Sequence, residues 1–164
     1  TCPHCYNTFK NEYPDLGGKY EVISYLQFIK SNIEEGSLKL NSQIFKDKRI
    51  TYHDPCYLGR ANGIYSEPRS VMKSLTCNFV EIGRHKSYAL CCGAGGAQMF
   101  KEAEKGSREV FIERTEEALA TEAGLIATAC PFCMTMITDG LKYRNKEEEI
   151  KNLDIAELVV QAMG

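Results

Sequence analysis

Five of the eight cysteines in this 164-residue sequence stand in segments that are typical of metal binding. They comprise one single cysteine, one adjacent pair and one CxxC pair: Cys56, Cys91, Cys92, Cys130 and Cys133. Thiolates are soft ligands that suit iron–sulfur clusters and zinc. In a reducing compartment, clustered cysteines bind metal or carry redox chemistry more often than they form disulfides. The pattern predicts one metal centre held by all five thiols.

The number of thiols favours one kind of metal centre over another. Zinc takes four tetrahedral ligands, so five thiols leave one unused, and adjacent cysteines rarely both reach the same small ion. A multi-iron cluster presents several metal atoms and therefore makes better use of the adjacent pair Cys91 and Cys92. An iron–sulfur cluster is the preferred interpretation, and a structural or regulatory zinc-binding module is the alternative.

Short β-rich runs alternate with helical patterns along the chain. Strands are expected at residues 20–24, 49–53, 78–82 and 125–129. Helices are expected at residues 25–35, 68–75 and 98–122, with a break near Gly106, and again after Cys133 and after Asp154. This alternation predicts an α/β fold with a mainly parallel sheet flanked by helices.

All five cysteines lie beyond the carboxyl ends of these expected strands. In an open parallel sheet those ends form the crevice where ligands bind, so loops that are distant in sequence can meet there. A CxxC that opens a helix places both sulfurs on one side of the first turn, where Pro131 is well tolerated. The glycines at 93, 95 and 96 would let the backbone approach a bulky ligand and offer N–H groups to its sulfides, although a simple tight turn is the alternative.

Composition excludes several other classes of function. The chain is 43% hydrophobic and 26% charged, as expected of one globular domain. Its net charge of −2, with both signs interspersed, provides no basic surface for nucleic acid. No apolar run is long enough for a transmembrane helix, and no signal peptide is recognisable. We expect a cytoplasmic protein, whose full-length form could still be membrane-associated.

A cysteine segment near the start of the chain repeats the CxxC segment. Residues 2–5 have the sequence CPHC, and residues 130–133 have the sequence CPFC. Only the second copy is preceded by further clustered cysteines, which indicates the C-terminal part of a two-repeat protein. We expect residues 1–19 to be the remnant of a first repeat and residues 20–164 to form the second.

Three segments carry a resemblance to a known family: residues 52–60 (YHDPCYLGR), 91–96 (CCGAGG) and 129–136 (ACPFCMTM). They resemble the second repeat of the cysteine-rich CCG domain family, which occurs in heterodisulfide reductase subunits B and D and in the iron–sulfur subunit of glycolate oxidase. The order and approximate spacing of the segments also fit that family.

The resemblance implies a four-iron cluster of an unusual, non-cubane kind, bound by Cys56, Cys91, Cys92, Cys130 and Cys133. It implies an electron-transfer domain of a multisubunit, heterodisulfide reductase-like oxidoreductase, with flavoprotein or ferredoxin-type subunits as partners and a disulfide or quinone as acceptor. By the same mapping, Cys2 and Cys5 close a first repeat whose other ligands are absent. We expect these two to be free, disulfide-linked or disordered.

Other residues are assigned less specific roles. His53 and Asp54 could supply a metal ligand or a proton relay, but local bonds to loop backbone are the simpler expectation. Cys77 is expected to be a small buried hydrophobe. Three isolated arginines are expected to be surface residues without a role, and two histidines have no evident partner: Arg60, Arg69, Arg84, His4 and His85. The glycine-rich turn lacks the third glycine of a dinucleotide fingerprint.

Overall fold

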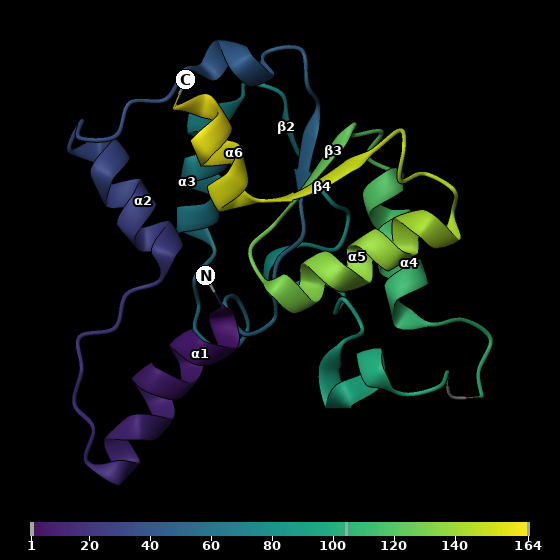
Figure 1. Ribbon diagram of the computed structural model, residues 1–164, viewed down its shortest axis with the longest axis horizontal. Coiled ribbons are helices and arrows are strands. Elements are labelled where there is room, and N and C mark those ends of the chain that lie inside the picture. The colour runs from purple at the N-terminus through teal and green to yellow at the C-terminus, as the bar shows by residue number, and fades with distance from the viewer. Residues whose placement is uncertain (1, 104, 164) are drawn as a thin grey trace.

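The computed structural model describes residues 2–103 and 105–163, so Thr1, Glu104 and Gly164 lie outside it. Its centre is a four-stranded, entirely parallel sheet in the order β2-β1-β3-β4 (Figure 1). The strands are β1 (Ile50–Tyr52), β2 (Phe79–Glu81), β3 (Leu125–Thr128) and β4 (Lys151–Asp154). The predicted α/β fold with a parallel sheet is therefore confirmed.

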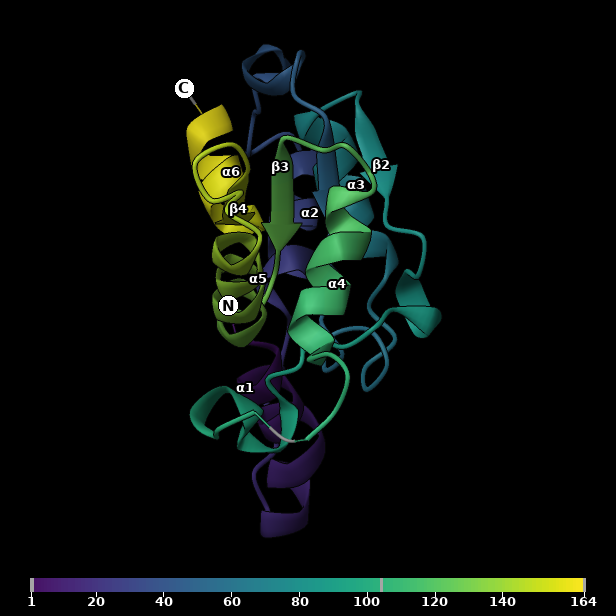
Figure 2. The same cartoon turned by 90° about the vertical axis from the view of Figure 1, so that its right-hand side faces the viewer.

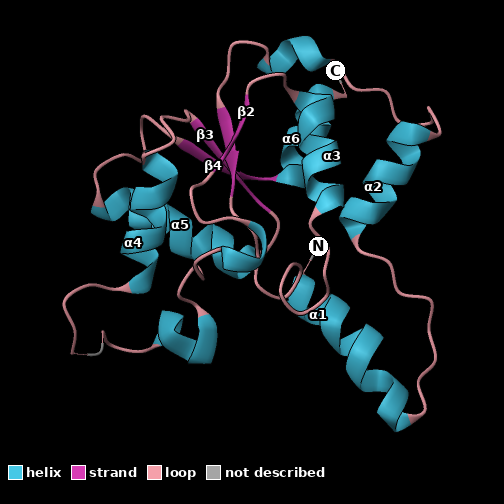
Figure 3. Cartoon of the chain, turned by 180° about the vertical axis from the view of Figure 1, so that it is seen from behind, coloured by secondary structure: helices cyan, strands magenta, loops and turns pink. Residues whose placement is uncertain are grey.

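Helices cover both faces of the sheet (Figure 3). One face packs against α2 (Tyr25–Glu34), α3 (Ser66–Leu75) and α6 (Ile155–Ala162). The other packs against α4 (Val110–Leu119) and α5 (Pro131–Tyr143). Successive side chains of β3 alternate between the two layers, because Leu125 and Ala127 join the first core and Ile126 joins the second.

Two strand expectations are wrong. Residues 20–24 form no strand, because Ser24 instead caps α2 through a reciprocal pair of hydrogen bonds with Gln27. Strand β4 was not expected, because its sequence KNLD offers a single apolar side chain. It is an edge strand, and Asn152 is held by donating to the Met134 carbonyl and to Thr138 Oγ1.

The long helix expected at residues 98–122 is broken near Gly106 as predicted, and its regular part is shorter. A 3-10 helix occupies Gly95–Phe100, and α4 begins only at Val110. The intervening sequence, KEAEKGSRE, has no apolar face to pack, and its described residues are largely exposed.

The N-terminal segment lies beyond the carboxyl ends of the strands (Figure 2). It consists of α1 (Pro3–Asn7), a π-helical turn (Thr8–Glu12) and a 3-10 turn (Tyr13–Leu16). Tyr6 anchors it, because this side chain is buried in the same core as α2 and α3. Further 3-10 turns span Ser42–Phe45 and Lys86–Tyr88. Among the described residues, every helix is too short or too polar to cross a membrane.

Candidate metal centre

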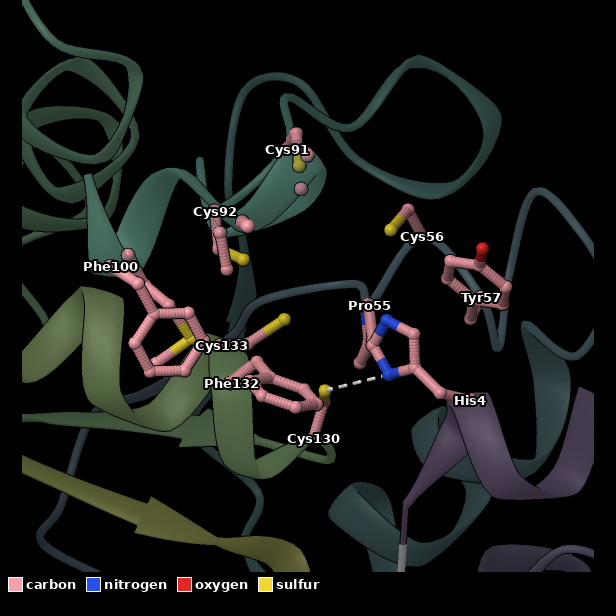
Figure 4. Close-up of a pocket in the computed structure, with 15 residues that line it drawn as sticks. His4, Pro55, Cys56, Tyr57, Cys91, Cys92, Phe100, Cys130, Phe132 and Cys133 are labelled. Carbon is pink, nitrogen blue, oxygen red and sulfur yellow. Dashed lines mark hydrogen bonds between the residues drawn. The ribbon is translucent and has the colours of Figure 1, made fainter.

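All five predicted cysteines line one cavity of about 320 Å³ beyond the carboxyl ends of the strands, which we call the cysteine cavity (Figure 4). Three separate segments deliver them. Cys56 lies in the loop after β1, the adjacent pair lies after β2, and Cys130 and Cys133 lie at the start of α5, directly after β3. The parallel order of the strands brings these segments together, as the sequence predicted.

The sulfurs form a chain of neighbouring thiols. Cys56 and Cys92 both lie within hydrogen-bond reach of Cys91, and Cys133 lies within reach of Cys92 and Cys130. Hydrogen bonds from the thiols of Cys56 and Cys92 lower the pKa of Cys91. The hydrogen bond between Cys56 and Cys91 in turn raises the pKa of Cys56. A thiol that donates such a hydrogen bond keeps its proton, and the thiol that accepts it ionises more easily. The site therefore favours a thiolate at Cys91 and a protonated thiol at Cys56.

The start of α5 stabilises a second thiolate. Cys130 is the N-cap residue, and Pro131 occupies the first turn, where an N–H group would have no helical partner. The Cys133 thiol and the backbone N–H groups of Cys133 and Phe132 donate to the Cys130 sulfur and lower its pKa to about 7. The CxxC pair therefore has the local electrostatics of a metal-binding segment.

The loop after the adjacent pair contains residues with positive φ angles, of which only Ala97 is strained. Gly93 and Gly96 have positive φ angles of 92° and 64°, and Ala97, which is not a glycine, has φ of 62°. The Gly93 N–H donates to Cys91 Sγ at 3.4 Å, and a Cβ at Gly93 would lie 3.1 Å from the Phe111 amide nitrogen. Gly93 thus permits a close approach of the backbone and supplies an N–H donor, whereas a Cβ at Gly95 or Gly96 would meet nothing within 4 Å.

A buried ionic network fixes the loop that carries Cys56. Asp54 accepts two hydrogen bonds from Arg69, at 2.8 and 2.9 Å, and Arg69 also pairs with Glu81. Although burial opposes ionisation of Asp54, the Arg69 guanidinium and the Lys86 amide lower its pKa. The expectation that Arg69 is a surface residue is therefore wrong, since it is 7% exposed.

His53 lies beneath the cysteines in an entirely buried position. Its Nδ1 accepts a hydrogen bond of 2.9 Å from Nε of Arg114, which is also fully buried. Burial, and secondarily the charge of Arg114, lower the pKa of His53 to about 3, so its ring is neutral. One ring nitrogen of His53 and the sulfurs of Cys92 and Cys133 lie within 4.8 Å of one another. The expected bonds to loop backbone are therefore wrong for this side chain.

His4 was missed as a site residue, although it lines the cysteine cavity. Its Nδ1 lies 3.9 Å from Cys130 Sγ and 3.8 Å from Cys2 Sγ, and its ring packs against Tyr57 and Phe132 (Figure 4). The only signal in the sequence was its place inside the CPHC segment, which says nothing of contact with Cys130.

The remaining cysteines lie outside the cysteine cavity. Cys2 and Cys5 are free thiols that line a second cavity of about 300 Å³, together with residues of the segment before α2. Cys77 is also a free thiol, but it is exposed, so the expectation of a buried hydrophobe was wrong. It follows α3 in the turn before β2.

Proteins similar to this chain are much longer than it. "EtfAB:quinone oxidoreductase" of Syntrophomonas wolfei is 41% identical over 99% of the chain, which spans 23% of that protein. "Probable iron-sulfur-binding oxidoreductase FadF" of Bacillus subtilis is 41% identical over 98% of the chain and 23% of its own length. One subunit of the dihydromethanophenazine:CoB–CoM heterodisulfide reductase of Methanosarcina barkeri is 36% identical over 99% of the chain and 40% of its own length.

No solved structure matches the chain. The family model described as a cysteine-rich domain, CCG, matches residues 50–138, which contain all five cysteines of the cavity. Because this match covers more than half of the sequence, the chain belongs to the CCG family of cysteine-rich domains.

Proposed function

We propose that this chain binds one four-iron iron–sulfur cluster in the cysteine cavity and relays electrons as a domain of a larger oxidoreductase. The convergence of five thiols from three strand ends on one cavity carries this proposal. The ligands would be Cys56, Cys91, Cys92, Cys130 and Cys133. When bound, the cluster supplies one-electron redox chemistry, and the protein supplies thiolates, N–H donors and a shielded site.

The residues present fit such a group. The pKa values of Cys91 and Cys130 are lowered by neighbouring donors, so thiolates form readily without metal. From Cys56 to Cys130, each sulfur lies within hydrogen-bond reach of the next, and the one group of three close ligand atoms among the described residues includes only two of these five cysteines. A multinuclear cluster uses such an extended set of donors better than a single zinc ion does.

The relatives support the role in electron transfer, because the names of all three describe oxidoreductases or a subunit of one. Partners of the flavoprotein or ferredoxin type, and a disulfide or quinone acceptor reached through them, are part of the proposal. So is a cytoplasmic location, where clustered thiols remain reduced. We further propose that residues 1–19 derive from a first CCG repeat and that residues 20–164 form the second.

The test is anaerobic reconstitution with iron and sulfide, followed by iron and acid-labile sulfide analysis and electron paramagnetic resonance. About four iron atoms per chain are expected for a four-iron cluster. Cys91→Ser and Cys130→Ser should lose most of the iron, because a protonated hydroxyl is a poor substitute for a thiolate.

Two matched controls apply the same substitution outside the cysteine cavity. Cys77→Ser and Cys5→Ser change exposed thiols and should retain the wild-type iron content. Equal losses in both sets of variants would contradict the assignment. One zinc ion per chain, with no visible absorption after reconstitution, would overturn it in favour of a zinc-binding module.

A further inference from the structure

The imidazole of His53, beneath the cysteine cavity, has incomplete hydrogen bonding. Its Nε2 is fully buried and has no hydrogen-bond partner among the described residues. An orphaned buried donor or acceptor costs free energy, because the group has left water without gaining a partner. Such a group at the edge of a proposed binding site points toward the ligand that would satisfy it.

Arg114 determines which nitrogen of the ring carries the proton. Its Nε–H can only donate, so Nδ1 of His53 must be the acceptor in their 2.9 Å hydrogen bond. In a neutral imidazole with an unprotonated Nδ1, the proton resides on Nε2. The orphaned atom is therefore an N–H donor.

This tautomer argues against His53 as a metal ligand. Ligation through Nε2 would require that nitrogen to lose its proton while Nδ1 remains an acceptor, which leaves an imidazolate. Metal-binding histidines instead donate from their second nitrogen to a carboxylate, carbonyl or water. The group formed by His53, Cys92 and Cys133 is consequently not a three-ligand metal site.

We infer that His53 is a positioning residue whose Nε2–H donates a hydrogen bond to sulfur at the buried end of the proposed cluster, either a cysteine thiolate or an inorganic sulfide. The inference deepens the proposed function and rests on it. One ring nitrogen of His53 lies within 4.8 Å of the sulfurs of Cys92 and Cys133, and Nε2, which has no partner among the described residues, is the nitrogen free to donate to sulfur there.

The wider network holds the donor in place. Arg114 Nη1 donates to the Arg84 carbonyl and pairs with Glu117 at 2.8 Å, which fixes the guanidinium. The His53 backbone N–H donates to the Ala127 carbonyl and so extends the pairing of β1 with β3. The backbone and the ring of His53 are thus both constrained before any cluster binds.

The first experiment uses the metal-free protein and is independent of cluster assembly. Nitrogen-15 NMR of the His53 side chain at neutral pH should show a protonated Nε2 and an unprotonated Nδ1. A protonated Nδ1 would overturn the inference, whether or not the protein binds iron. Failure to assemble a cluster would instead overturn the proposed function, so the two failures are distinguishable.

The second experiment uses reconstituted protein and two substitutions of His53. His53→Phe keeps a planar ring without a donor, whereas His53→Gln can place an amide N–H near the former Nε2. A hydrogen bond to sulfur stabilises the more negative, reduced cluster. The Phe variant should therefore show a lower midpoint potential at wild-type iron content, and the Gln variant should recover most of the shift.

Spectroscopy separates a donor from a ligand in the wild type itself. Pulsed electron paramagnetic resonance with nitrogen-15 histidine should detect only the weak coupling of an N–H group to sulfur. A strong coupling, typical of nitrogen bonded to iron, would overturn the inference. Unchanged potentials in both variants at full iron content would overturn it as well.

Discussion

Arg69→Met should lower the free energy of unfolding by about 3–5 kcal/mol, because it strands a buried carboxylate. The side chains of Arg69 and Asp54 are 9% and 3% exposed, and two hydrogen bonds of 2.8 and 2.9 Å join them. Methionine retains most of the apolar stem but none of the guanidinium donors. Among the described residues, Asp54 would keep only the Lys86 N–H as a hydrogen-bond partner.

A double-mutant cycle separates the pair from its surroundings. Adding Asp54→Asn to Arg69→Met removes the uncompensated charge and retains an acceptor for the Lys86 amide. The double variant should recover much of the loss, with a coupling energy of about 2–3 kcal/mol, as expected of contacting residues in one network. The assay is urea denaturation of metal-free protein under reducing conditions.

Arg84→Met is the matched control. Arg84 also pairs with two carboxylates, Glu113 and Glu117, but its side chain is 44% exposed. Ion pairs in solvent contribute little, so the same substitution should have a much smaller effect there. Equal losses at Arg69 and Arg84 would refute the reasoning, because burial would then not determine the strength of the network.

Three further substitutions or treatments test other parts of the structure. Gly140→Ala should destabilise the fold by about 1–3 kcal/mol despite the better helix propensity of alanine, since a Cβ there would overlap Thr115 on α4. Gly124→Ala is the control, because its Cβ would meet nothing within 4 Å, and it should be nearly neutral in urea denaturation. Burial raises the pKa of Asp154, so its stabilising contribution is greatest below the unfolded pKa and is lost as the pH rises through the higher native one. Asp154→Asn, which keeps the Oδ1 cap acceptor, should therefore gain in stability on the wild type as the pH rises above the unfolded pKa of aspartate, about 4. Removing iron by chelation should leave the far-ultraviolet circular dichroism nearly unchanged, because both sheet cores are formed without the cavity thiols, and a collapse of helical signal would contradict this.

The strands could be predicted where an apolar sequence coincides with a buried position in the sheet. Strands β1 and β3 are apolar and fully buried, so composition alone indicates them. Strand β4 was not predicted, because it is stabilised by backbone pairing with β3 and by the hydrogen bond of Asn152. Neither interaction requires an apolar sequence pattern. Residues 20–24 misled in the opposite direction, since only Val22 of their apolar side chains packs against the core, whereas Tyr20 and Ile23 are largely exposed.

The cysteines of the site could be predicted, but the residues that support them could not. Clustered cysteines indicate metal binding by their residue type and spacing alone. The role of an arginine depends on which side chains it contacts in the folded protein. Arg114 and His53 are 61 residues apart in sequence and meet because α4 packs on the face of the sheet that carries Ile126 of β3. His4 likewise reaches Cys130 from a segment 126 residues away. Such contacts depend on tertiary packing that periodicity does not encode.

The thiols are carried by two kinds of backbone, well-packed elements and an irregular loop. Cys130 and Cys133 are carried by α5, which is packed on the second core, and Cys56 follows a strand fixed by the Asp54 network. The adjacent pair precedes a loop with successive left-handed residues, Gly96 and Ala97. The proposed cluster would thus meet three thiols held by well-packed elements and two that precede a loop with an αL alanine.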